Sequence, residues 1–82
     1  MICKYTLTVH CACPVDDGRD MYVAVCESPS LIPVETIIAA AKEFEAAKAF
    51  QEELTLSLAR KLGCKVTTTG HHSGVLTEVT AP

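Results

Sequence analysis

The sequence lacks the features that mark several large protein classes. No apolar run is long enough to span a bilayer as a helix. Residues 1–6 lack the charged region, apolar core and cleavage site of a secretory signal peptide. There is no basic run, and the net charge is −3, which argues against a tight DNA or RNA binder. We therefore expect a cytoplasmic protein that does not associate with membranes.

Metal-binding spacings are also missing. The five cysteines include Cys11 and Cys13, one residue apart, but no Cys-x-x-Cys or Cys-x-x-His spacing occurs, so the sequence predicts no metal site. An odd number of cysteines is a poor disulfide framework, and in a cytosolic protein most of them should be small buried apolar side chains. His71 and His72 are flanked by glycines, so we expect solvated turn residues there.

The chain has 82 residues and no internal repeat, linker or low-complexity segment, so residues 1–82 are expected to form one domain. Apolar residues make up 49% of it and charged residues only 21%. Because so small a domain buries a limited core, part of the apolar surface is expected to lie between the subunits of a homo-oligomer.

The first third of the sequence predicts a β-hairpin. Residues 4–12 alternate between apolar and polar side chains, which is typical of a half-buried strand. Pro14 ends this strand, and the Asp-Asp-Gly at residues 16–18 favours a turn. Residues 21–27 are strand-like again, so the two segments should pair in an antiparallel hairpin.

The middle of the sequence predicts helix. Pro33 suits the first turn, and Glu35 suits the positive end of the helix dipole. Gly63 is well placed to cap the C-terminal end. Residues 45–49 contain no strong break, so one long helix and two helices are both open, and two fit a small domain better. The apolar positions are Val34, Ile37, Ile38, Ala41 and Phe44 in the first set and Phe50, Leu54, Leu58 and Leu62 in the second.

The last part of the sequence predicts a second hairpin. Residues 64–69 are rich in valine and threonine, residues 70–74 favour a turn, and residues 75–80 alternate again. The predicted fold class is therefore α+β, in the order strand, strand, helix, helix, strand, strand, with both helices on one face of a four-stranded antiparallel sheet. Such a sheet has two open edges, and joining the sheets of neighbouring subunits into a barrel would close them.

Two residues beside the first turn are candidates for catalysis. Cys13 precedes Pro14 at the end of a strand, an exposed and rigid position that suits a thiolate nucleophile. Asp20 begins the returning strand, so a closed hairpin would bring the two together as nucleophile and proton donor or acceptor. The spacing alone also fits a buried thiol and a turn carboxylate.

Glu52 lies at the start of the second predicted helix, in the segment Phe50-Gln51-Glu52. An acidic residue there is often only a complement to the helix dipole. A buried glutamate can instead accept two hydrogen bonds from the amino and ring N–H edge of a guanine-like base.

The segment that runs from Cys13 through Asp20 into the next strand resembles the active-site segment of the nitrile reductases of queuosine biosynthesis, the QueF family. The family pattern is Cys-Pro-x-Thr-Gly-Gln-Pro-Asp before a strand. Here Cys13, Pro14 and Val15 are followed by Asp20 and a Tyr-Val-Ala-Val strand.

A second segment extends the resemblance over most of the chain. The Phe-Gln-Glu that ends at Glu52 is similar to the family's Phe-His-Glu and, more distantly, to the Gln-Glu of GTP cyclohydrolase I. Both families have the tunnelling fold, with two strands, two helices and two strands per unit. The resemblance therefore implies this fold, in multi-subunit barrels that bind purine or pterin ligands between subunits.

The resemblance implies a role for each candidate residue. Cys13 would attack the nitrile of 7-cyano-7-deazaguanine and form a covalent thioimide, and Asp20 would supply or relay the proton. Glu52 would anchor the deazaguanine ring. A nitrile carbon is a modest electrophile, so a thiolate and an acid are needed together.

The sequence departs from the reductases in the cofactor segment. Their Glu-Ser-Lys-Ser-x-Lys stretch holds the phosphate of NADPH, whereas residues 34–40 match only its acid, Glu35, and lack both lysines. The cofactor therefore stays open, although the family implies NADPH. The amidine-forming enzymes of archaeosine synthesis keep the thioimide chemistry but add ammonia and act on tRNA. The acidic charge of this chain gives no support for a tRNA partner.

His71 is a further candidate. The turn at residues 70–71 is similar to a GTP cyclohydrolase segment that carries a zinc-binding cysteine just after its histidine, but Ser73 and Gly74 follow here. The predicted substrate-binding residues are therefore Glu52, Glu35 and His71. A non-catalytic purine- or pterin-binding or structural oligomer on the same fold is the remaining alternative, and the missing lysines favour it. Such a protein needs no reactive cysteine, so the reactivity of Cys13 would separate the two hypotheses.

Overall fold

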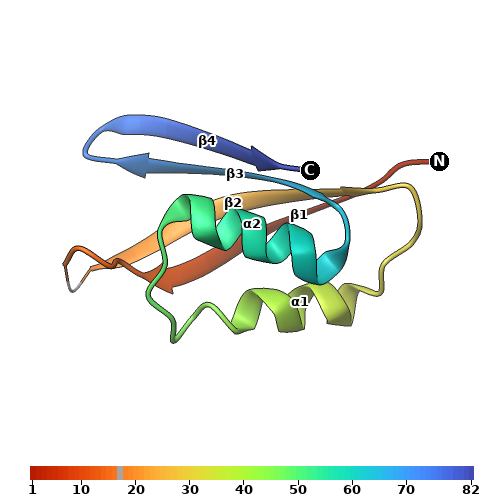
Figure 1. Ribbon diagram of the computed structural model, residues 1–82, viewed down its shortest axis with the longest axis horizontal. Helices are drawn as coiled ribbons and strands as arrows, with labels where there is room; N and C mark the ends of the chain where they lie inside the picture. Colours follow the sequence, from red (N-terminus) through yellow and green to blue (C-terminus); the bar gives the residue numbers. More distant parts are fainter. Residues whose placement is uncertain (17) are drawn as a thin grey trace.

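The computed structural model describes residues 1–16 and 18–82. Its four strands form one antiparallel sheet in the order β1-β2-β3-β4, and both helices lie on the same face of this sheet (Figure 1). The predicted α+β architecture with two separate helices is confirmed. The elements are β1 (Cys3–Ala12), β2 (Arg19–Ser28), α1 (Val34–Lys42), α2 (Gln51–Leu62), β3 (Lys65–His72) and β4 (Val75–Ala81).

The first hairpin is formed as predicted, with β1 and β2 paired along their whole length. At the turn, the N–H of Gly18 donates to Oδ1 of Asp16 at 2.7 Å, a contact typical of aspartate in turns. Asp17, the middle residue of the predicted turn, lies outside the described residues. β2 begins two residues earlier than predicted, which places Asp20 inside the ladder, opposite Cys11.

The core lies between the sheet and the helices. β1 and β2 turn alternate side chains toward it, as their period of two predicts, and α2 adds Leu54 and Leu58, both almost fully buried. The predicted apolar positions Val34, Ile38 and Phe50 are instead about half exposed in the single chain. The sequence predicts that surplus apolar surface of this kind lies between subunits. The barrel assembly itself stays a prediction.

α2 ends where its sequence predicts. Gly63 follows its last residue with a φ of 63°, in the left-handed region that favours glycine, and the N–H of Cys64 donates to the carbonyl of Ala59. At the other end, Oε1 of Glu53 accepts the N–H of Phe50 at 3.1 Å. Neither helix among the described residues has the length and apolar character needed to cross a membrane.

The turn predicted at residues 70–74 is wrong in length. β3 continues through His72, which pairs with Val75, and only Ser73 and Gly74 form the turn, with φ angles of 51° and 82°. Two central residues with positive φ are typical of a tight hairpin, whose twist matches that of the strands. His71 and His72 are therefore strand residues that point to opposite faces, and the expectation of turn histidines is corrected.

Candidate active site

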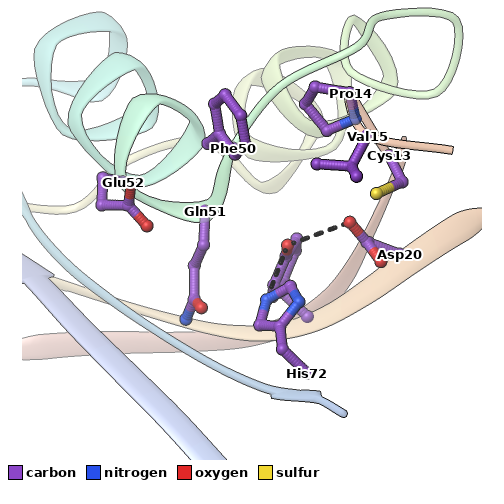
Figure 2. Close-up of a pocket in the computed structure, with 9 residues that line it drawn as sticks. Cys13, Pro14, Val15, Asp20, Phe50, Gln51, Glu52 and His72 are labelled. Atoms are coloured by element: carbon purple, nitrogen blue, oxygen red, sulfur yellow. Dashed lines mark hydrogen bonds between the residues drawn. The ribbon is translucent and has the colours of Figure 1, made fainter.

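A cavity of about 200 Å³ lies at the end of the sheet where β1 meets the first hairpin turn (Figure 2). The structure brings three of the predicted site residues to this cavity: Cys13, Asp20 and Glu52. They come from the turn, from β2 and from α2. The other residues that line the cavity are Pro14, Val15, Tyr22, Phe50, Gln51 and His72.

Backbone hydrogen bonds hold Cys13 in place. The N–H of Ala12 donates to the carbonyl of Ala47 at 2.8 Å, and the carbonyl of Ala12 accepts the N–H of Ala49 at 3.3 Å. The end of β1 is thus paired with the segment that links the two helices. Cys13 itself donates its N–H to the carbonyl of Gly18 at 2.9 Å. The thiol is partly exposed on a rigid backbone, as a nucleophile requires.

The same pairing places the start of α2 at the cavity. Because Ala49 is bonded to β1, the residues that follow it, Phe50 to Glu52, enter the lining at the N-terminal end of the helix. The partial positive charge of that helix end favours the carboxylate of Glu52. In Figure 2, Glu52 and Cys13 lie at opposite ends of the group of side chains, so a ligand that contacts both has to extend across the cavity.

Gln51 ties α2 to the sheet. Its side chain is 3% exposed, and Nε2 donates to the carbonyls of Thr68 at 3.2 Å and Thr77 at 3.0 Å. Carbonyls only accept, so these contacts fix which end of the amide is the nitrogen. Oε1 is buried and has no hydrogen-bond partner among the described residues. Gln51, which stands where the family's Phe-His-Glu has histidine, therefore holds α2 against the sheet.

Asp20 lies at one end of a hydrogen-bonded chain. The hydroxyl of Tyr22 is 3.3 Å from Oδ2 of Asp20 and 3.2 Å from Nε2 of His72. Tyr22 is 1% exposed. Burial, together with the negative charge of Asp20, raises the pKa of Tyr22 well above its ordinary value of 10.0, so the hydroxyl keeps its proton.

Tyr22, Gln51 and His72 have no role in the site that the sequence predicts. Strand alternation carried three residues further, from Thr69 to His72, would have placed His72 on the helix-facing side of β3, together with Thr68 and Gly70. Gly70 suggested a turn instead, so His72 was not assigned to the strand. Tyr22 was assigned only to a strand.

Two predicted site residues lie away from the Cys13 cavity of their own chain. Glu35, in the first turn of α1, lines a hollow between the two helices. His71 is exposed on the face of β3 opposite to His72. Their roles as substrate-binding residues stay predictions.

Two observations on the described residues bear on a metal and on the phosphate of a nucleotide cofactor. Within residues 1–16 and 18–82, no group of three or more histidine, cysteine, aspartate or glutamate side chains could hold a metal ion. In the hollow beside Glu35, the lining includes one lysine, Lys61, and it forms an ion pair with Glu43. The phosphate-binding lysines of the reductases therefore have no replacement in this hollow.

Comparisons with known proteins support the fold. No family model and no curated protein matches the sequence. Among solved structures, the chain is similar to the archaeosine synthase QueF-Like in its apo form, with a TM-score of 0.88 and 20% sequence identity. The alignment covers 98% of this chain and 90% of that chain. The chain therefore has the fold of that protein, and the tunnelling-fold architecture predicted for a single unit is confirmed.

Proposed function

We propose that this chain is an enzyme that acts on the nitrile of 7-cyano-7-deazaguanine through covalent addition of Cys13. The observation that carries the proposal is that Cys13, Asp20 and Glu52 line the same cavity. These are the three residues that the sequence motifs select. The likeness of the fold to that of an archaeosine synthase supports the same class of chemistry.

The proposed first step is thioimide formation. The thiolate of Cys13 adds to the nitrile carbon, a C–S bond forms, and one π bond of the C≡N group breaks. The nitrogen takes a proton from Asp20. Figure 2 supports this pairing, because Cys13 and Asp20 lie at the same end of the group of labelled side chains.

Glu52 is the proposed anchor of the ring. Its carboxylate has two oxygens that can accept the amino and ring N–H hydrogens of a deazaguanine. The cavity of about 200 Å³ is smaller than the sites that usually enclose small ligands, which measure roughly 300–1,000 Å³. One chain therefore covers the ring only in part, and we propose that a second copy completes the site.

Ammonia is the second substrate that we favour over hydride. Ammonia would attack the thioimide carbon, the C–S bond would break, and the product would leave as the protonated amidine, with the Cys13 thiolate restored. The missing phosphate-binding lysines and the paired state of Lys61 argue against NADPH. The archaeosine synthase likeness points the same way, since amidine formation is the reaction that the resemblance implies for that class.

Product analysis tests this choice. The protein is incubated with 7-cyano-7-deazaguanine and either ammonium or NADPH, and the same reactions are run with tRNA that carries the nitrile base. We expect the amidine with ammonium, identified by mass spectrometry, and no product with a Cys13→Ser variant. Formation of the aminomethyl base with NADPH would identify a reductase instead. No product on either substrate would favour the non-catalytic binding or structural oligomer.

A further inference from the structure

The hydroxyl of Tyr22 lies between Asp20 and His72, within hydrogen-bond distance of both (Figure 2). A phenol carries one hydrogen, and a carboxylate only accepts. With Asp20 ionised, Tyr22 therefore donates to Asp20 and accepts from the Nε2–H of His72. With Asp20 protonated, both bonds reverse, and Tyr22 donates to a bare Nε2 of His72. The two arrangements differ by one proton displaced along the chain.

Packing fixes the phenol ring independently of these hydrogen bonds. A Cβ atom placed on Gly70 of β3 would lie 2.5 Å from Cδ1 of Tyr22, so the ring rests directly on a position that must be glycine. The ring of His72 lies 5.7 Å from that of Tyr22, centroid to centroid. The hydroxyl is thus held between its two partners by the sheet itself.

His72 differs in exposure and in charge from its two partners in the hydrogen-bonded chain, Tyr22 and Asp20. His72 is partly exposed, whereas Tyr22 is buried, so the histidine is the member of the pair that meets solvent. Among the described residues that line the cavity, it is the one side chain that can become positively charged. The titratable groups that face the chain are Cys11 of β1, Cys13 of the turn, Asp20 of β2 and Glu52 of α2.

We infer that Tyr22 and His72 are positioning residues for Asp20 and carry a proton from solvent to it. This inference rests on the proposed function. While Asp20 is ionised, Tyr22 passes its own proton to the carboxylate and takes the Nε2 proton of His72, and Asp20 then gives its proton to the nitrile nitrogen. His72 then regains a proton from water. Each thioimide formed from a Cys13 thiolate thus consumes one proton from water.

The test is the rate at which the intact protein gains the mass of 7-cyano-7-deazaguanine, from about pH 6 to pH 8, where histidine ordinarily changes its charge. Tyr22→Phe removes the hydroxyl but keeps the ring on Gly70. His72→Gln keeps an N–H donor that has no exchangeable charge in this range. We expect each variant to slow the maximal rate by about 10- to 100-fold, at the low end of general acid–base catalysis.

The pH profile separates proton transfer from a structural role. In His72→Gln the pH profile of the rate should differ from that of the wild type, while the ligand concentration for half-maximal rate stays the same. His10→Gln, on the exposed face of β1, is the matched control and should keep the wild-type rate and profile. A His72→Gln protein with the wild-type rate and profile would overturn the proton path.

A second measurement needs no substrate, so it separates the inference from the proposed function. NMR of the His72 imidazole reports which ring nitrogen carries the proton. We expect this signal to change in both Asp20→Asn and Tyr22→Phe. Identical His72 signals in all three proteins would show that the hydrogen-bonded chain is absent in solution. If the signals change but the wild type gains no mass, the proposed function fails and the catalytic use of the path falls with it.

Discussion

Burial separates the cysteines of this chain into two groups. Cys13 in the cavity and Cys3 at the start of β1 are partly exposed, whereas Cys11, Cys26 and Cys64 are buried. Burial raises the pKa of Cys11 and Cys64 above the ordinary value of 9.0 and raises that of Cys26 to about 11. These three thiols are therefore held in the protonated, unreactive form at neutral pH. The sequence could not rank the five cysteines, because their burial depends on the packing of the helices on the sheet.

The raised pKa of Cys26 predicts a loss of stability in alkali. In the unfolded chain the thiol loses its proton near pH 9.0, whereas in the folded protein it holds the proton to about pH 11. Between these values deprotonation favours the unfolded state, so the free energy of unfolding falls as the pH rises, by up to about 1.4 kcal/mol per pH unit. Urea denaturation at several pH values, under reducing conditions, measures this fall. It should be less steep in Cys26→Ala than in the wild type, and equal slopes would show that Cys26 is not responsible.

Only the residues of the candidate site that belong to local sequence motifs were predicted. Cys13 and Asp20 are joined by a short turn, and Glu52 belongs to a contiguous segment, so the resemblance of these local motifs to those of a known family was enough to select them. His72 is 50 residues from Tyr22 in sequence, and its contact with the hydroxyl depends on how β2 pairs with β3. No local pattern carries that information.

At the scale of the elements, period and caps predicted both hairpins, the helical segments and the end of α2, and the small size of the domain favoured two helices over one. The error at residues 70–74 has a physical cause. Glycine is common in turns, but Gly70 is a strand residue that is small because the ring of Tyr22 lies against it. A glycine that is required by a contact from another strand cannot be told from a turn glycine by its sequence neighbours.

Gly70→Ala should therefore harm both stability and the site. The added Cβ forces the Tyr22 ring to move, and overpacking of this kind costs about 1–3 kcal/mol in the free energy of unfolding. The displaced hydroxyl should also slow adduct formation at Cys13. Gly63→Ala is the matched control, because it strains a left-handed position by about 1–2 kcal/mol, with nothing within 4 Å of the added Cβ.

Denaturation and adduct rates, measured on both glycine variants, check this prediction. Both variants should be less stable than the wild type, but only Gly70→Ala should react more slowly. An unchanged adduct rate in Gly70→Ala would mean that the position of Tyr22 does not matter for the site.

At the scale of the whole molecule, the single unit leaves two kinds of surface uncovered. Among the described residues, β4 pairs with β3 alone, and β1 pairs with β2 and, at Ala12, with the segment that links the helices, so most of both sheet edges is open. Apolar side chains of Val34 and Ile38, beside Tyr5 and Leu7, line a hollow between α1 and the β1 edge. Both features fit a second copy that adds a strand at the edge and covers the apolar positions.

Ile38→Lys should therefore reduce the size of the oligomer. The side chain is 45% exposed in the single chain, so a lysine there should leave the fold of each unit intact while it opposes burial between subunits. Light scattering should give a smaller mass than for the wild type, with an unchanged circular dichroism spectrum. A monomeric wild-type protein would contradict the assembly outright.

The central claim is that Cys13 is a nucleophile for a nitrile, and the intact mass of the protein tests it most directly. The wild type and Cys13→Ala are incubated with 7-cyano-7-deazaguanine, denatured and weighed by mass spectrometry. We expect the wild type to gain the mass of one ligand and the variant to gain none. An equal gain in both proteins would place the reaction elsewhere. No gain in the wild type, with or without ammonium, would contradict the claim and leave Cys13 as a residue of a binding or structural protein.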